Sequence, residues 1–290
     1  MSVSANELML EAAEVLRNAG VPEARRQAAS LMQDVIRRDR TFLLSHPEYV
    51  LSQEEEDRFR QNLTRRASGE PLQYITGIQT FFGLDFDVTK DVLIPRPETE
   101  LLVESALKLI ADNSHPHICD VGTGSGCIAI SIVHEHRRAT AIAIDISEAA
   151  LRVAQRNAER HSVSDRIDFV AADCLSAIRP NHTVDLVVSN PPYVAGSAWA
   201  GLQREVRDHE PRVALLSGAD GLTMIRRLLV EAESVLKPGG HLLFEMGFDQ
   251  GAAVEQLVNR RVWLILDIHP DLQGIPRIVV LQKNSSESIL

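Results

Sequence analysis

The chain has 290 residues, about twice the size of an ordinary domain, so we expect two domains. Its 44% hydrophobic and 24% charged residues exclude a disordered chain. Thirty basic against forty acidic residues give a net charge of −10, which disfavours a surface built mainly to hold phosphates, and three cysteines are too few for a disulfide framework.

Neither pattern that directs a protein to a membrane is present in the sequence. The first residues lack a basic start followed by an unbroken apolar stretch, and nowhere do 18 apolar residues run together. No membrane partner is expected, and we predict a soluble, cytoplasmic protein. Histidine and cysteine residues do not recur at ligand spacing, so no metal site is expected.

The first 75 residues carry a helical pattern. Ser4 and Ser52 each begin a capping box, the signal that starts a helix. Pro22 suits the first turn of another helix, in which apolar residues form one stripe over residues 28–36. We therefore expect residues 1–75 to form a small N-terminal helical domain.

The pattern changes after this region. Residues 76–97 contain short β-type runs on either side of Gly83, which predicts a β-hairpin linker. From 98 to 284, strand-like and helical runs alternate, which predicts an α/β domain with a mostly parallel sheet covered on both faces. Residues 285–290 are polar enough to form a flexible tail. The expected helices cover 101–111, 126–136, 148–161, 220–236 and 250–259.

The last two strand-like runs lie near 262–268 and 276–282. Only a segment containing Pro and Gly separates them, which is too short for a helical crossover. We therefore expect these two strands to pair antiparallel.

A glycine-rich turn, Cys119 to Gly126, lies between a predicted strand and a predicted helix. Glycines here let a ligand approach the backbone, although a tight turn that binds nothing has the same pattern. Asp145 ends the next predicted strand, where its carboxylate suits the two hydroxyls of a ribose or caps the following helix. Turn and acid together favour a nucleoside-type cofactor, and the G-x-G-x-G spacing differs from the G-x-G-x-x-G of dinucleotide folds.

These features resemble the class I S-adenosylmethionine-dependent methyltransferases. The resemblance implies a Rossmann-like fold with a seven-stranded, mostly parallel sheet whose last strand is antiparallel. It also implies S-adenosyl-L-methionine as cofactor and S-adenosyl-L-homocysteine as product. By the same resemblance, the methionine part is held by Asp120 and the loop of Gly122, Thr123, Gly124, Ser125 and Gly126, the ribose by Asp145, and the adenine lies beside Asp173 and Cys174, with Asn190 completing the cofactor contacts.

The predicted strand 184–189 ends in Asn190-Pro191-Pro192-Tyr193. Two prolines stiffen the backbone, so the Asn190 side-chain oxygen and a neighbouring carbonyl become fixed acceptors for a planar –NH₂ group. Such acceptors stabilise the positive charge that develops when the nitrogen is methylated. Tyr193 suits packing of its ring against the target group. A rigid proline turn capped by Asn190 is the structural alternative.

The Asn-Pro-Pro-Tyr loop occurs on enzymes that act on glutamine amides and on those that act on exocyclic amines of adenine or guanine. The segments Pro71–Gly77, Phe82–Phe86 and Val92–Glu100 resemble the release factor glutamine methyltransferases, and the resemblance covers nearly the whole chain. It implies that the substrate is the glutamine of the Gly-Gly-Gln motif in class I peptide-chain release factors, and that residues 1–75 bind the release factor.

A nucleic-acid amine methyltransferase is the alternative, which would require a basic channel and a pocket for an extruded base. The net acidity counts against it, so no stable nucleic-acid partner is expected. Arg96 lies between Pro95 and Pro97, and Glu98 follows the second proline. Both are candidates either for substrate binding or for a surface salt bridge and helix capping. The segment 194–219 is expected to be a long loop that covers the substrate.

Overall fold

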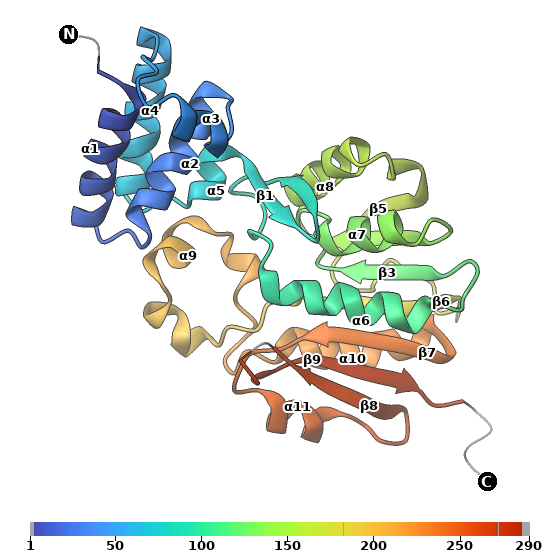
Figure 1. Ribbon diagram of the computed structural model, residues 1–290. Coiled ribbons are helices and arrows are strands. Elements are labelled where there is room, and N and C mark those ends of the chain that lie inside the picture. The colour runs from blue at the N-terminus through green and yellow to red at the C-terminus, as the bar shows by residue number, and fades with distance from the viewer. Residues whose placement is uncertain (1–2, 182, 272, 286–290) are drawn as a thin grey trace. The chain divides into compact units, whose positions relative to one another are not determined.

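The computed structural model describes residues 3–181, 183–271 and 273–285, so residues 286–290 of the expected tail lie outside the described residues. The chain divides into two compact units (Figure 1). We call Met1–Ile78 with Gln203–His209 the helical unit, and Gln79–Leu202 with Glu210–Leu290 the sheet unit. In the described part of the chain, no helix is both long and apolar enough to cross a membrane.

The helical unit is built from amphipathic helices. Both predicted capping boxes are confirmed: Ser4 begins α1 and Ser52 begins α4. Pro22 lies just outside α2, whose N-terminal flanking residue is Glu23. Two short helices, α3 and α5, were not predicted. The helices are α1 (Ala5–Asn18), α2 (Ala24–Ile36), α3 (Arg40–Ser45), α4 (Gln53–Ala67), α5 (Leu72–Thr76) and α9 (Arg204–His209).

The helix α9 belongs to this unit although it lies within the segment predicted as one long loop. That segment also contains two 3₁₀ helices, Gly196–Gly201 and Arg212–Ala214, so the expected long loop over 194–219 includes short helical elements that were not predicted. Arg66 of α4 is almost completely buried and forms an ion pair with Glu205 of α9. Its guanidinium also donates to the Glu70 carbonyl at 2.9 Å. This long-range pairing has no local sequence signal.

The sheet unit contains a two-stranded sheet and, within the described ranges, a seven-stranded sheet in the order β5-β4-β3-β6-β7-β9-β8. Only β9 runs antiparallel to its neighbours, β7 and β8, as predicted. The strands are β1 (Ile78–Phe81), β2 (Leu84–Asp87), β3 (His117–Val121), β4 (Thr140–Asp145), β5 (Ile167–Ala171), β6 (Val184–Ser189), β7 (Leu236–Glu245), β8 (Trp263–Pro270) and β9 (Pro276–Lys283).

Helices cover both faces of the large sheet, because alternate strand residues point to opposite sides. Ile118 and Leu186 join the core on the side of α6 and α7, whereas Cys119 and Val187 join the core on the side of α10 and α11. The predicted α/β class is thus confirmed. The helices are α6 (Glu100–Ile110), α7 (Cys127–Glu135), α8 (Glu148–Arg160), α10 (Thr223–Val235) and α11 (Gly251–Leu257).

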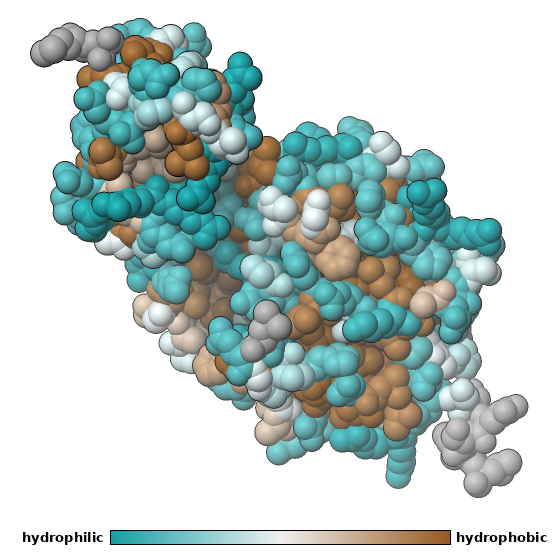
Figure 2. Space-filling model, in the orientation of Figure 1, coloured by the Kyte–Doolittle hydropathy of each residue, from teal (hydrophilic) through white to brown (hydrophobic). Residues whose placement is uncertain are grey.

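The hairpin β1–β2 is shorter than predicted. The hairpin linker was expected over residues 76–97, but β2 ends at Asp87. Val92 and Ile94 lie outside β2 but are buried, which is why an apolar run there resembled a strand. In the seven-stranded sheet, β8 is an edge strand. Figure 2 shows hydrophobic surface over β8 and β9.

Candidate active site

The candidate site lies where the parallel strands end. The register places Val121 opposite Ile144, Asp145 opposite Ala171, and Ser189 opposite Phe244. The residues that follow these strands therefore leave the sheet at one edge, which is where open α/β sheets bind ligands. Residues far apart in the sequence meet there.

The glycine turn follows β3, and its three glycines all have positive φ, between +56° and +82°. A β-carbon added at Gly122 or Gly124 would meet nothing within 4 Å, so the backbone there is open to a ligand. Gly126 differs, because an added β-carbon would lie 2.7 Å from Ile130 Cδ1. A glycine is required at position 126 because α7 packs closely there, whereas Gly122 and Gly124 leave room for a bound molecule.

Asp120 lies beneath this turn and is completely buried. Its Oδ2 accepts hydrogen bonds from the Thr123 hydroxyl at 2.6 Å and from the Ala129 amide at 3.2 Å. Its Oδ1 has no hydrogen-bond partner among the described residues. Burial raises the pKa of Asp120 to about 7, although the two hydrogen bonds oppose that shift.

Asp145 ends β4 and supports the same turn. Its Oδ2 accepts from the Gly124 amide at 2.9 Å and its Oδ1 from the Ser147 amide at 2.9 Å. Ser147, not Asp145, caps α8, because its hydroxyl accepts from the Ala150 amide. Each Asp145 oxygen keeps a further lone pair for a hydroxyl group. Burial raises the pKa of this carboxyl above its usual value.

Asp173 and Cys174 follow β5. The Asp173 carboxylate pairs with Arg227 of α10 at 2.6 Å, and more than half of its side-chain surface is exposed. Cys174 is buried with a φ of +55°, and burial beside Glu231 raises the pKa of its thiol to about 12. The thiol is therefore neutral and unreactive at physiological pH.

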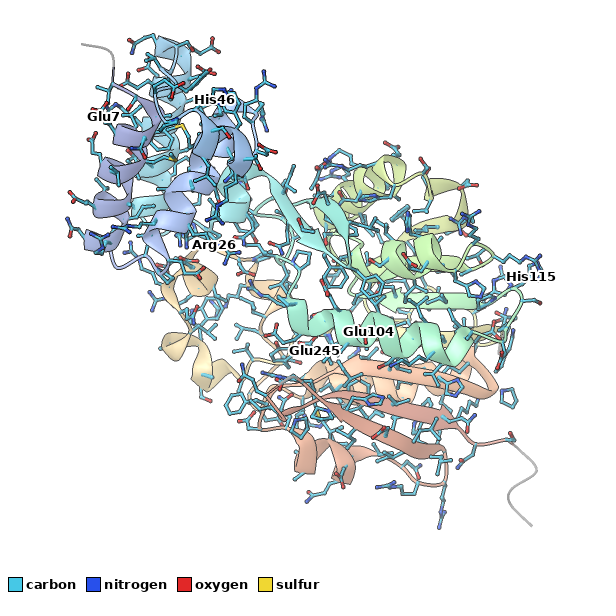
Figure 3. All side chains as sticks on the ribbon, in the orientation of Figure 1. Glu7, Arg26, His46, Glu104, His115 and Glu245 are labelled. Atoms are coloured by element: carbon cyan, nitrogen blue, oxygen red, sulfur yellow. The ribbon has the colours of Figure 1, made fainter. Side chains whose placement is uncertain are left out.

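Asn190 begins the proline loop after β6 and is half-buried. Its Nδ2 donates to Thr99 Oγ1 at 2.9 Å, and Thr99 Oγ1 in turn donates to Glu245 Oε2 at 2.7 Å. Tyr193 donates its hydroxyl hydrogen to Glu245 Oε1 at 3.4 Å. Glu245 lies at the end of β7, close to the beginning of α6 (Figure 3).

Burial changes the pKa values of Glu245 and Tyr193. Only 2% of Thr99 and 2% of Glu245 are exposed. Burial raises the pKa of Glu245, whereas the Thr99 hydrogen bond and the nearby Arg277 oppose the shift. Burial and the neighbouring Glu245 also raise the pKa of Tyr193. Tyr193 is therefore a neutral hydrogen-bond donor.

A second support holds the backbone of the loop. Gln250 Nε2 donates to the Tyr193 carbonyl at 3.0 Å and to the Gly221 carbonyl at 3.3 Å. Gly221 packs so closely that an added β-carbon would lie 2.3 Å from the Tyr193 oxygen. The proline loop is therefore fixed by residues from two other segments as well as by its own prolines.

Arg96 forms an ion pair with Glu210, whose side chain is almost completely buried. Glu210 precedes Pro211, which lies at the point where the chain returns to the sheet unit after α9. Glu98 is exposed and is no partner of Arg96. The salt bridge of Arg96 is therefore made with Glu210, which is distant in the sequence. For the residues that the structure describes, no side-chain hydrogen bond connects Glu98 to the site.

These segments enclose a cavity of about 270 Å³. The predicted site residues that do not line it are Asp120, Gly126, Pro191, Tyr193, Arg96 and Glu98. Among described residues, no group of three or more His, Cys, Asp or Glu side chains could hold a metal ion. The predicted residues that line the cavity are Gly122, Thr123, Gly124, Ser125, Asp145, Asp173, Cys174, Asn190 and Pro192.

Sequence reasoning missed three residues of this site: Thr99, Glu245 and Gln250. Glu245 had a signal, because it is an acidic residue at the end of an otherwise apolar strand run. The same reasoning that identified Asp145 would have identified it. Thr99 and Gln250 have no local signal, because their partners are distant in the sequence.

Comparisons with known proteins agree with this architecture. Residues 7–77 match the PrmC N-terminal domain family and residues 97–206 match the methyltransferase small domain family. The hMettl16 catalytic domain, solved in complex with MAT2A 3′UTR hairpin 6, has a TM-score of 0.58 and 16% identity over 87% of this chain and 94% of that chain. At this identity the likeness shows the fold alone, which is the predicted methyltransferase fold.

Relatives match over almost the entire chain. The release factor glutamine methyltransferase of Koribacter versatilis is 42% identical over 271 residues, which cover 93% of this chain and 95% of the relative. The release factor glutamine methyltransferase of Moorella thermoacetica is 44% identical over 249 residues, covering 86% of this chain and 87% of the relative. The chain therefore belongs to the release factor glutamine methyltransferase family.

Proposed function

We propose that this protein methylates the side-chain amide nitrogen of the glutamine in the Gly-Gly-Gln motif of class I peptide-chain release factors. Relatives named for this activity match nearly the full chain, including the N-terminal helices. The observation that carries the proposal is the Asn190 carboxamide, which lines the same cavity as Gly122 and Asp145. An amide-binding group and the predicted cofactor turn thus meet in one place.

The cavity fits S-adenosyl-L-methionine, the methyl donor of this enzyme class. The open backbone at Gly122 and Gly124 suits close approach of the methionine part, with Thr123, Ser125 and Gly126 shaping the turn. The unpartnered Asp120 Oδ1 supplies a buried acceptor beneath it. We assign the ribose hydroxyls to Asp145, and the adenine to the wall formed by Asp173 and Cys174. When bound, the cofactor supplies an electrophilic methyl group.

The protein's own residues orient the glutamine amide. An amide nitrogen is a poor nucleophile because its lone pair is delocalised. We assign the Asn190 Oδ1 and a carbonyl of the loop to accept the two amide hydrogens, which fixes the nitrogen and stabilises its developing positive charge. Pro191 and Pro192 keep these acceptors in place. Tyr193, tied through its hydroxyl to Glu245, can present its ring to the substrate.

Two further assignments concern the rest of the substrate. We propose that the helical unit docks the body of the release factor, because a single glutamine side chain gives little binding surface by itself. Arg96 pairs with Glu210, so we assign it to fixing the loop that returns to the cavity rather than to direct contact. Glu98 is exposed and remains a candidate for substrate contact. A release factor substrate implies action in the cytoplasm.

The test is methyl transfer from radiolabelled S-adenosyl-L-methionine to a purified release factor. A Gly-Gly-Gln→Gly-Gly-Ala release factor and duplex DNA serve as controls. Label on the unmodified release factor alone supports the proposal. Label on DNA, or equal label on the Gly-Gly-Ala variant, would refute it in favour of a nucleic-acid amine or of another protein residue.

A further inference from the structure

A chain of three polar side chains runs from the cavity wall into the core of the sheet unit. Asn190 Nδ2 donates to Thr99 Oγ1, and Thr99 donates to Glu245, with donor–acceptor distances of 2.9 and 2.7 Å. Asn190 lines the cavity, whereas only 2% of Glu245 is exposed. These hydrogen bonds therefore connect Asn190, which faces the cavity, to Glu245, which solvent hardly reaches.

Hydrogen-bond chemistry gives this chain a single direction. Glu245 accepts from the Thr99 hydroxyl through Oε2 and from the Tyr193 hydroxyl through Oε1, so it acts as a carboxylate, and the one hydroxyl hydrogen of Thr99 is committed to it. The remaining lone pairs of Thr99 can then only accept, and the part of the Asn190 carboxamide that can donate is its –NH₂ group. Nδ2 therefore points to Thr99, and Oδ1 occupies the other branch of the carboxamide.

We propose that Thr99 and Glu245 are positioning residues that orient the Asn190 carboxamide, so that it presents an acceptor and selects an amide over a carboxylate. This inference rests on the proposed function. The –NH₂ group of a glutamine only donates, so it pairs with Oδ1. A rotated Asn190 would present Nδ2 instead, which opposes a glutamine –NH₂ but binds the carboxylate of a glutamate.

The fold explains why these residues meet. Ser189 of β6 is paired with Phe244 of β7, so Asn190, which follows β6, and Glu245, the last residue of β7, are neighbours at this edge of the sheet. Thr99 is the last residue of a short 3₁₀ helix that leads into α6. A buried carboxylate costs several kcal/mol relative to an apolar side chain of similar size. Stability alone therefore gives no reason for an acid at position 245.

The first measurement compares Thr99→Val with Thr99→Ser in the full chain. Valine has the shape of threonine without the hydroxyl, whereas serine keeps the hydroxyl. Thr99→Val should lower kcat by about 10- to 100-fold, because the carboxamide loses its orientation, while the KM for the release factor stays within about threefold. Thr99→Ser should restore kcat to within about threefold of wild type.

The second measurement determines the preference of the enzyme for an amide over a carboxylate. A purely structural role of Thr99 and Glu245 would leave this preference unchanged. Competition assays compare the binding of the Gly-Gly-Gln release factor with that of its Gly-Gly-Glu variant. Wild-type enzyme should prefer the amide by at least about tenfold, since a carboxylate opposes Oδ1. The preference should fall below about threefold in Thr99→Val and in Glu245→Gln, whose amide can donate to Thr99, and persist in Thr99→Ser.

The third measurement needs no substrate. In NMR spectra of the wild-type protein, an Asn190 Nδ2 proton, identified by its loss in Asn190→Ala, should show a nuclear Overhauser effect to the Thr99 side chain. If this contact is seen and the release factor is not methylated, the proposed function fails while the orientation stands. If the release factor is methylated but the contact is absent, or Thr99→Val keeps wild-type kcat and selectivity, the inference is overturned.

Discussion

Replacing Asp120 by asparagine should change how the stability of the cofactor-free protein depends on pH. The pKa of Asp120 is raised from 3.8 to about 7 by burial. Because the folded-state value is the higher one, a neutral Asp120 stabilises the fold below about pH 4, and that stabilisation is lost as pH rises to about 7. A shift of about three pKa units corresponds to about 4 kcal/mol in total.

Between pH 5 and pH 8 the loss amounts to about 2 to 3 kcal/mol. Asparagine does not titrate, so the stability difference between Asp120→Asn and the wild type should move by this amount in favour of the variant. Urea unfolding at each pH measures it. The fluorescence of Trp263, buried in the sheet unit, reports the transition when the other tryptophan is removed by Trp199→Phe.

A second variant should enlarge the pH-dependent loss of stability that Asp120→Asn removes. The Thr123 hydroxyl donates to Asp120 at 2.6 Å and holds the pKa of Asp120 down. Thr123→Val should therefore extend the pH-dependent loss of stability to higher pH. A stability difference between Asp120→Asn and the wild type that stays constant from pH 5 to pH 8 would refute the reasoning, since it would mean that the folded-state pKa of Asp120 is not near 7.

Three further substitutions, one with a matched control, test other parts of the structure. Asn190→Ala should lower turnover by about 10²- to 10³-fold, while calorimetry gives a cofactor Kd within about threefold of wild type. Gly221→Ala should destabilise the sheet unit by at least about 2 kcal/mol in urea unfolding, because the new β-carbon would lie 2.3 Å from the Tyr193 oxygen at a φ of +77°. Arg66→Ala should destabilise the helical unit by about 2 to 4 kcal/mol, measured by circular dichroism, because it removes a guanidinium that is only 1% exposed together with its hydrogen bonds to Gln27, Glu70 and Glu205. Arg65→Ala, which breaks a more exposed ion pair, should cost less than about 1 kcal/mol.

Each result has a clear opposite. Normal turnover in Asn190→Ala would remove the carboxamide from the proposed chemistry. Wild-type stability in Gly221→Ala would show that the Tyr193 carbonyl can move freely. Equal losses of stability in Arg66→Ala and Arg65→Ala would show that the burial of Arg66 does not increase its contribution to stability.

The sequence by itself determined the elements and the glycine turn. The capping boxes at Ser4 and Ser52, the strand 184–189 and the alternation after residue 98 are local patterns, and local backbone preferences produce them. Gly122 and Gly124 were identified for the same reason, because a strand-to-helix turn of this kind needs positive φ. The assignment of this turn to S-adenosyl-L-methionine came from a family resemblance, and that of Asn190 to the target amide from the stiff proline loop; both stay predictions.

Only the tertiary structure decided which distant residues meet. Thr99 and Glu245 are 146 positions apart, and Arg66 and Glu205 are 139 apart, yet each pair is in contact. The membership of α9 in the helical unit was equally hidden, because nothing in residues 203–209 distinguishes a loop from a docked helix. Strand register and packing bring such residues together, and neither is written in the pattern of any single segment.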